Sequence, residues 1–381
     1  MSGYSTLRAP RFDVPLVNLR ATHETLFREL RTAFERVVGH ASFVGGEEVH
    51  SFERELAAYV GSPHAVGLGS GTAALYLTFV AAGIGAGDEV ILPPNTFFAT
   101  VEAVIAAGAT PVFVDVNPNT ALLDPAAAEC AVGWRTAAVV PVHLYGQPVA
   151  MEQYERMAAR RGLFLVDDAA QALTATRNGR SVGSFGDATA FSFHPNKNLG
   201  ALGEAGAVTT PDTGLADRIR LLRSHGEVRK NVHLRVGVNE RLDALQAAFL
   251  SVKLHHLDCM QQARLQAEQR YRQRLAHVDG VRPLERDLGG QSACHLMVVR
   301  VARRDAVLRR LHEAGIEAGV HYPTPIHLQP ACHEFGGRPG QLPEAEQLAN
   351  SVLSLPLFPE ITEAQIERTV ECLEAAIEVT Q

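Results

Sequence analysis

The sequence predicts a mixed α/β fold, with a mainly parallel central sheet flanked by helices and a smaller α+β unit after it. Between about residues 60 and 210, short apolar runs alternate with amphipathic stretches of helical period, as in parallel sheets joined by covering helices. After Gly280 the alternation gives way to a half-exposed strand and further helices. Because 381 residues exceed one typical domain, we expect a large domain over 1–255 and a small one over 256–381, with the N-terminal segment packing on the latter.

The predicted strands are mostly continuous runs of Val, Ile, Leu and Phe, typical of strands buried on both faces. They cover 64–68, 89–92, 111–115, 137–143, 163–167, 188–193 and 205–209, and a half-exposed strand follows at 295–301. Helical periodicity predicts helices over 72–82, 99–107, 151–161, 241–274, 305–314, 344–352 and 363–379. Thr362 precedes the last helix in the position of an N-cap.

Composition excludes several classes of protein. The net charge is −7 and no basic stripe dominates any segment, so we expect no nucleic-acid partner. The first ten residues lack the apolar stretch of a secretory signal, and the most apolar window, 97–116, is broken by Glu102 and by Gly and Pro, which predicts a buried helix and strand rather than a membrane span. Five cysteines without a C-x-x-C pair suit reduced thiols in the cytoplasm. His256 and Cys259 have no further ligand nearby in sequence, so no metal site is expected.

Lysine is rare in this chain: only Lys197, Lys230 and Lys253 occur among 35 basic residues. Lys230 stands in a polar run and Lys253 among polar neighbours on a predicted helix, so we expect both to be ordinary surface charges. Lys197 instead lies among Gly, Pro and apolar residues in the stretch 191–200. Because Arg cannot replace a lysine that must lose its proton and form an imine, Lys197 is a candidate for covalent chemistry.

Lysine-bound pyridoxal phosphate (PLP) also requires an acid that keeps its pyridine nitrogen protonated. Asp168 is the candidate, because an apolar strand delivers Asp167 and Asp168 to its carboxyl end, where open α/β sheets bind ligands. Gln171, three residues further on, could donate to the hydroxyl of the ring. The alternative is that the two aspartates only cap a following helix.

The cofactor's phosphate requires an anion site, and the Gly-rich stretch 67–74 is the candidate. A strand runs there into a turn and a helix begins, with free N–H groups and with Gly71 and Thr72 in its first turn. Ser192, five residues before the lysine, could add a hydroxyl. The alternative is a dinucleotide-binding turn, but that motif needs glycine where Thr72 stands and an acid closing the second strand, whereas Asp88 precedes that strand.

A flat group is needed to stack on the ring, and Phe97 and Phe98 follow a strand that ends in prolines. One of these rings could face a ligand while the other packs in the core. Taken alone, the pair favours core packing for either residue. The order along the chain is more informative, since the Gly-rich turn, the aromatic, the acid and the lysine each follow a strand of their own.

With these motifs in place, the chain resembles the DegT/DnrJ/EryC1/StrS sugar aminotransferases, a branch of the PLP enzymes with the aspartate-aminotransferase-like fold (fold type I). The resemblance runs nearly from end to end. The motifs that carry it are Phe43-Val-Gly-Gly-Glu-Glu-Val49, Ser70-Gly-Thr72, Pro141-Val-His-Leu-Tyr-Gly-Gln147, Asp168-Ala-Ala-Gln171, the lysine loop, Gly237-Val-Asn-Glu-Arg-Leu-Asp243, His321-Tyr-Pro-Thr-Pro-Ile-His327 and Leu353-Ser-Leu-Pro-Leu-Phe-Pro359.

The resemblance implies a role for each residue of the cofactor site. Lys197 would form the imine with PLP and serve as the acid and base of the proton shift, with Asp168 on the pyridine nitrogen and Gln171 on the ring oxygen. Asn239 would reach the phosphate bound by a second subunit, so the active sites of a homodimer would be shared. The remaining cofactor contacts implied are stacking by Phe97 and phosphate binding by Gly71, Thr72 and Ser192.

The resemblance also bears on the substrate. His321, Tyr322 and, with less support, His327 would lie near the sugar, and His194 stands where relatives often carry Tyr. The loop 197–207 is similar to that of enzymes acting on 3-keto nucleotide sugars, commonly dTDP-3-keto-6-deoxyhexoses. Dehydratases of the family carry His in place of Lys197, which disfavours that reaction.

The sequence therefore predicts a cytoplasmic PLP-dependent transaminase that takes an amino group from L-glutamate, holds it as pyridoxamine phosphate (PMP) and passes it to a dTDP-linked ketosugar at C3. Amination at C4 is the alternative within the family. From other classes, the alternatives are a non-catalytic regulatory protein that keeps the fold and an NAD-dependent sugar oxidoreductase. The sequence identifies neither the hexose and its stereochemistry nor the nucleotide base and the pathway.

Overall fold

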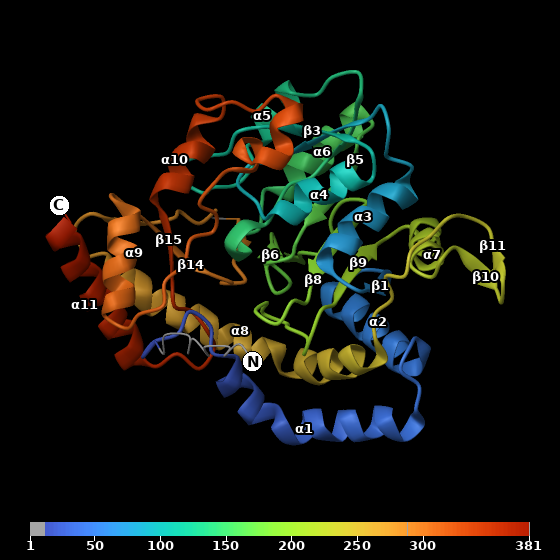
Figure 1. Cartoon of the computed structure of the whole chain (residues 1–381), viewed down its shortest axis with the longest axis horizontal. Helices are drawn as coiled ribbons and strands as arrows, with labels where there is room; N and C mark the ends of the chain where they lie inside the picture. Colours follow the sequence, from blue (N-terminus) through green and yellow to red (C-terminus); the bar gives the residue numbers. More distant parts are fainter. Residues whose placement is uncertain (1–11, 288, 381) are drawn as a thin grey trace, which may run out of the picture.

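A seven-stranded sheet forms the centre of the computed structural model, which describes residues 12–287 and 289–380 (Figure 1). The strands lie in the order β1-β9-β8-β5-β4-β2-β3. All neighbours from β8 to β3 are parallel, and β9 runs antiparallel to β8 and to β1, so the predicted mainly parallel sheet is confirmed. The bounds are β1 His64–Leu68, β2 Glu89–Leu92, β3 Thr110–Phe113, β4 Thr136–Val139, β5 Phe164–Asp168, β8 Ala188–Ser192 and β9 Gly206–Thr210.

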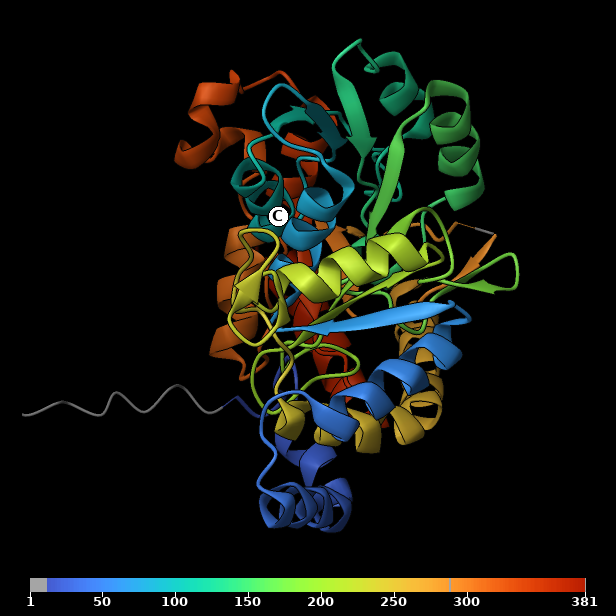
Figure 2. The same ribbon diagram turned by 90° about the vertical axis from the view of Figure 1, so that its right-hand side faces the viewer.

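Helices cover both faces of this sheet because alternate strand residues point in opposite directions. Val90 and Leu92 pack with α3, α4 and α7 on one face, while Ile91 packs with α5 and α6 on the other. In Figure 2, α7 and α2 lie on opposite sides of β1, the edge strand. The bounds are α2 Gly46–Val60, α3 Gly71–Ala82, α4 Phe98–Ala106, α5 Pro125–Cys130, α6 Met151–Arg161 and α7 Thr213–Leu222.

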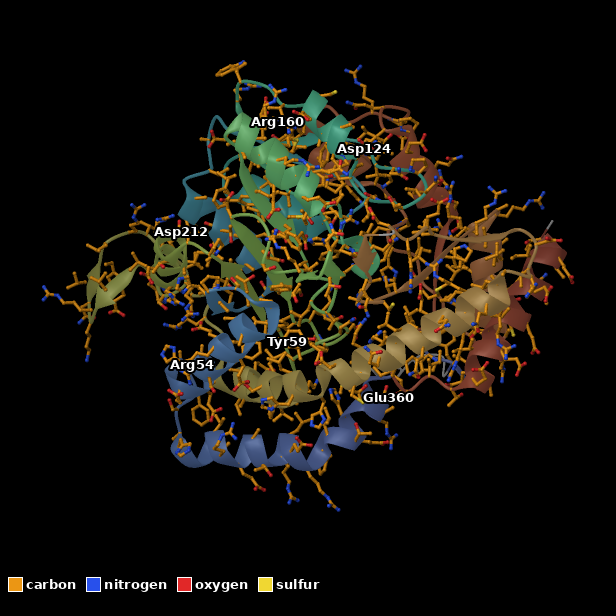
Figure 3. All side chains as sticks on the ribbon, turned by 180° about the vertical axis from the view of Figure 1, so that it is seen from behind. Arg54, Tyr59, Asp124, Arg160, Asp212 and Glu360 are labelled. Atoms are coloured by element: carbon orange, nitrogen blue, oxygen red, sulfur yellow. The ribbon has the colours of Figure 1, made fainter. Side chains whose placement is uncertain are left out.

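Two helices that the sequence patterns did not predict, α1 (Leu19–His40) and α2, lie on opposite sides of the long α8 (Ala244–Leu275). Leu26, Leu30 and Val37 of α1 are buried against the first turns of α8. Figure 3 shows α1 below α8 and shows Tyr59 of α2 above it, where the Tyr59 hydroxyl donates to Asp258 over 2.7 Å. The first half of α8 is therefore covered from two sides.

The C-terminal unit is built on a small antiparallel sheet, with β14 between β12 and β15. Thr362 caps α11 as predicted, since its hydroxyl accepts from the N–H of Gln365 over 3.3 Å while the Gln365 side chain accepts from the N–H of Thr362 over 3.0 Å. The bounds are β12 Val281–Pro283, β14 Met297–Val301, β15 Val352–Leu355, α9 Arg304–Glu313, α10 Pro343–Ser351 and α11 Glu363–Thr380.

The segment before α1 joins this unit, because Val14 pairs with Ile316 and is buried in its core. The predicted boundary at 255/256 falls inside α8, whose later residues Tyr271 and Leu275 belong to the C-terminal core, and it stays a prediction. The other short elements are β6 Thr176–Arg177, β7 Arg180–Ser181, β10 Glu227–Arg229, β11 Val232–His233, β13 Gly290–Gln291, η1 Leu144–Gly146, η2 Ile326–Leu328 and η3 Pro330–Phe335.

The apolar window 97–116 forms α4 and β3, as expected for buried elements. Over residues 12–287 and 289–380, no helix has the length and apolarity needed to cross a membrane. Residues 1–10, in which the sequence shows no secretory signal, lie outside the described residues.

Lys253 on α8 is not the surface charge that its neighbours in sequence indicated. Its side chain is buried beneath α1, and its ammonium group donates to the carbonyl of Gly200 over 2.6 Å and lies 2.9 Å from Nε2 of His23. Burial lowers the pKa of Lys253 to about 8. The prediction failed because α1, which covers this side of α8, gave no recognisable signal.

Lys253 should make the stability of the protein depend on pH. The pKa of its side chain is about 8 in the folded chain and 10.5 when exposed, so over this interval the unfolded chain binds more protons and stability rises with pH. We expect the unfolding midpoint of wild type, measured relative to that of Lys253→Met, to rise between about pH 8 and about pH 10.5. Denaturant titrations with Lys230→Met, at an exposed lysine, as control would test this; parallel pH curves for wild type and Lys253→Met would contradict it.

Candidate active site

A cavity of about 620 Å³ opens at the carboxyl ends of the parallel strands. It is bordered by the first turn of α3, the start of α4, the end of β5, the loop after β8 and the segment around His321. Ten of the residues predicted for the site line it together: Gly71, Thr72, Phe97, Asp168, Gln171, Ser192, His194, Lys197, His321 and Tyr322.

Lys197 sits on the loop between β8 and β9. The loop is tight, since the N–H of Lys197 donates to the carbonyl of His194 over 2.8 Å and a Cβ on Gly200 would lie 2.2 Å from the carbonyl oxygen of Pro195. Burial lowers the pKa of the Lys197 ammonium, and the negative charge of Asp168 opposes part of that shift. The amine is therefore easier to deprotonate than a surface lysine, as imine formation requires.

Asp167 and Asp168 end β5 and point to opposite faces of the sheet, as successive strand residues must. Asp168 lines the cavity, where one oxygen accepts from the hydroxyl of Thr100 over 2.7 Å and the other from the N–H of Ala170 over 3.0 Å. The chain then turns without forming a helix, so the idea that the aspartates cap a helix is wrong. Asp167 is fully buried, 3.0 Å from the hydroxyl of Thr189, and burial raises its pKa.

The Gly-rich turn packs against the lysine loop. Ser70 caps α3 by accepting from the N–H of Ala73 over 3.0 Å, so the first turn of the helix faces the cavity. A Cβ on Gly71 would lie 2.6 Å from the Cβ of Ser192, which means that only glycine fits between the two segments. This helix N-terminus with the hydroxyls of Thr72 and Ser192 suits a phosphate group.

Two aromatic rings, Phe97 and Tyr322, and the side-chain amide of Gln171 also line the cavity. Phe97 has 58% of its surface exposed, so it does not pack in the core as the pair of phenylalanines taken alone favoured, and its ring is accessible for the stacking that the resemblance implies. It lies 5.8 Å from the ring of Tyr322 between centroids. Gln171 accepts from the N–H of Tyr145 over 2.6 Å and donates to the hydroxyl of Tyr322 over 3.3 Å, which fixes its amide at the cavity edge.

Two predicted residues lie outside this cavity. Asn239 is exposed on the segment before α8 and does not line the cavity of its own chain. His327 is 1% exposed and lies 3.1 Å from a carboxylate oxygen of Glu346, so its predicted contact with substrate is wrong and it stabilises the segment η2 instead. His327 is the middle residue of the 3₁₀ turn η2, and nothing in the sequence indicated that this turn would be buried.

The structure also adds residues to the site that the motifs did not single out. Thr100 holds Asp168, and His143 lines the cavity with its Nε2 3.3 Å from Asp167. His295 lines it from the C-terminal unit, and Asn198 lies 3.1 Å from that ring. Thr100 lies in the predicted helix 99–107 and Asn198 directly follows Lys197, whereas His295 lies ninety-eight positions from Lys197 and only the fold brings these two together.

These features define a class of enzyme. A lysine, a carboxylate, an exposed aromatic ring and the N-terminus of a helix meet at the carboxyl edge of a parallel sheet, and Gly71 lets that helix end lie close against Ser192. The residues present fit PLP, and the chain is a PLP-dependent transaminase.

Comparison with known proteins places the chain within that class. Residues 25–374 match the model of the DegT/DnrJ/EryC1/StrS aminotransferase family, and the chain belongs to this family. It is 46% identical to the erythromycin biosynthesis sensory transduction protein EryC1 of Saccharopolyspora erythraea, covering 95% of this chain and 99% of that one. It is 42% identical to the dTDP-3-amino-3,4,6-trideoxy-alpha-D-glucose transaminase of Streptomyces venezuelae, covering 97% of each.

Solved structures agree with the sequence relatives. The crystal structure of S. venezuelae DesV in complex with a ketimine intermediate superposes with a TM-score of 0.94 at 42% identity, covering 97% of this chain and 99% of that chain. More distant solved relatives hold PMP or PLP. The predicted fold type and cofactor are thereby confirmed.

The gap at Gly71 should control cofactor affinity. In Gly71→Ala the new methyl group would press on Ser192 and push the phosphate-binding segments apart, so we expect PLP to bind at least about tenfold more weakly, or roughly 1.4 kcal/mol. Fluorescence titration of the PLP-free enzyme would measure this. Gly39→Ala is the matched control, because a Cβ there meets nothing within 4 Å; equal affinity in the two variants would contradict the assignment.

Proposed function

We propose that this transaminase moves an amino group from L-glutamate to C3 of a nucleotide-linked ketosugar, of the dTDP-3-keto-6-deoxyhexose class. The observation that carries the proposal is the cavity that Asp168 lines together with Lys197 and Glu204 of the lysine loop 197–207. The amino-acid sequence of that loop resembles the corresponding loop of enzymes that act on 3-keto sugars. The S. venezuelae relative is named for a 3-amino sugar.

The cofactor, when bound, withdraws electrons and carries the amino group between the two substrates. We assign Lys197 to hold the cofactor covalently; once released as a free amine, it would carry the proton between the nitrogen-bearing carbon of the substrate and the cofactor. Asp168, fixed by Thr100 and Ala170, would keep the ring nitrogen protonated. Phe97 would stack on the ring, Gln171 would reach its oxygen, and Gly71, Thr72 and Ser192 would hold the phosphate.

The sugar would lie between His194, His321 and Tyr322 at the cavity. Burial, with a smaller contribution from the charge of Lys197, lowers the pKa of His321 to about 4, so this ring is neutral at physiological pH. Its Nδ1 lies 2.9 Å from the hydroxyl of Ser354, which fixes its orientation. His194 is half exposed beside Glu204, with 3.9 Å between Nε2 and the carboxylate, and such a pair suits sugar hydroxyls better than an apolar group.

We further propose that the enzyme is a cytoplasmic homodimer with shared active sites. Asn239 is exposed and does not line the cavity of its own chain, which leaves it available to a second subunit. Phe27, Phe34 and Val38 leave exposed apolar surface on α1, which a second copy would cover. We also propose that residues 1–255 form the cofactor-binding domain and residues 256–381 the small domain.

Two alternatives remain to be tested against this proposal. Amination at C4 would use the same cofactor site with a different orientation of the sugar. A non-catalytic regulatory role is suggested by the relative whose name is a sensory transduction protein. The presence of Lys197, Asp168 and the phosphate turn in one cavity favours catalysis.

Lys197→Ala tests the chemistry. We expect the variant to bind PLP without covalent attachment, so that borohydride treatment leaves no cofactor on the chain, and to lose transamination between glutamate and the ketosugar by about 10³-fold or more. Mass spectrometry after reduction and a coupled assay of 2-oxoglutarate would measure both. Lys230→Ala, at an exposed lysine, is the control. Normal turnover by Lys197→Ala would refute the mechanism.

The position of amination is tested with PMP-loaded enzyme and a panel of 3-keto and 4-keto nucleotide sugars. We expect the visible absorption of the lysine-bound cofactor to return at least about tenfold faster with 3-keto sugars, since discrimination by well-placed polar contacts is of this size or larger. Faster return with 4-keto sugars would favour the alternative. No return with any sugar, in protein that binds PLP covalently, would favour the regulatory role.

A further inference from the structure

A hydrogen-bonded chain links the residue after the catalytic lysine to a histidine of the cavity. The side-chain amide of Asn198 donates to the carbonyl of Ala293 over 2.6 Å, and its oxygen lies 3.1 Å from Nδ1 of His295. The backbone of this segment is itself fixed, because Ala293 donates to the carbonyl of Gly146 over 2.8 Å. Lys197 is thus followed directly by a residue that is clamped on two sides.

These hydrogen bonds of Asn198 determine which ring nitrogen of His295 carries the proton. A carbonyl can only accept, so the amide nitrogen of Asn198 must face Ala293 and its oxygen must face His295. An amide oxygen can only accept as well, so Nδ1 of His295 carries the proton. In a neutral ring the other nitrogen, Nε2, then has a free lone pair.

His295 is kept neutral by its surroundings. The side chain is 8% exposed, and the charges that face it are all positive or potentially positive: Lys197, Arg264, His321 and His194. Burial and then the charge of Lys197 lower the pKa of His295 well below its ordinary value. Nε2 has no hydrogen-bond partner within the described ranges, and the ring borders the cavity that Lys197 also lines.

We propose that His295 is a positioning residue, a neutral acceptor that receives a hydrogen bond from the Lys197 amino group through Nε2, with its tautomer fixed by Asn198. This inference rests on the proposed function, in which Lys197 moves the proton as a free amine. An acceptor on the ammonium form stabilises that form and orients it, so Lys197 is held at a fixed place when it gives or takes a proton. A second positive charge at this position would instead expel the ammonium.

The tautomer can be observed without turnover. In PMP-loaded enzyme labelled with ¹⁵N-histidine, the resonances of His295 are those absent from His295→Gln. We expect a protonated Nδ1 and an unprotonated Nε2, with no titration between about pH 6 and about pH 8. In Asn198→Ala the ring should lose this fixed tautomer. A protonated Nε2 or a charged ring in the wild type would overturn the proposal.

The effect on Lys197 can be observed because the chain has so few lysines. The rate of acetylation of Lys197 in PMP-loaded enzyme, followed by peptide mass spectrometry over a range of pH, reports its deprotonation, with Lys230 as internal control. We expect His295→Phe to move the profile to lower pH and to reduce kcat by about tenfold to a hundredfold with little change in KM for the ketosugar. His295→Gln, which keeps an acceptor, should restore most of both.

Each remaining outcome has a definite meaning. A rise in KM with an unchanged acetylation profile would show that His295 contacts the sugar, and equal losses in His295→Phe and His295→Gln with an unchanged profile would show a structural role; either would overturn the proposal. These failures differ from failure of the proposed function, which would appear as normal turnover in Lys197→Ala while the state of His295 stayed unaffected.

Discussion

The active site depends on placing a lysine where its positive charge is poorly solvated. Lys197 lies on the loop after β8 at the end of the parallel strands, and Asp168 is the carboxylate that opposes the effect of burial on the pKa of Lys197. The rest of the site follows from this pair. Thr100 holds the carboxylate and the loop around Gly200 holds the lysine, while burial lowers the pKa values of His295 and His321 and keeps both rings uncharged.

The sheet explains why these groups meet. Parallel strands deliver their carboxyl ends to one edge, so residues that follow separate strands converge although they are far apart in sequence. The strand periodicity also sorts Asp167 from Asp168, sending one carboxylate into the core beneath the site and the other into the cavity. Two neighbouring acids of the same type thereby serve different purposes.

Much of this could be predicted because the relevant signals are local. Continuous apolar runs located the strands of the central sheet, and the glycine gap at Gly71 follows from a motif of a few residues. What failed was non-local. Lys253 was expected at the surface, but α1 buries it. Some apolar residues of α1 are exposed, so the sequence of this helix does not show which side packs against the protein. His327 belongs to a motif near the site, yet its side chain turns away to Glu346.

Lys253 and Lys197, the lysine proposed to bind the cofactor, are connected through the same loop. Lys253 donates to the carbonyl of Gly200, three residues after Lys197, while Asn198 is held by Ala293 and bonded to His295. The loop is therefore fixed from α8 on one side and from the C-terminal unit on the other. The proposed chemistry requires a rigid backbone here, because a lysine that forms and breaks a covalent bond in each cycle must return to the same place. Most basic residues of this chain are arginines, yet two of its three lysines meet at this loop: Lys197 belongs to it and Lys253 donates to it.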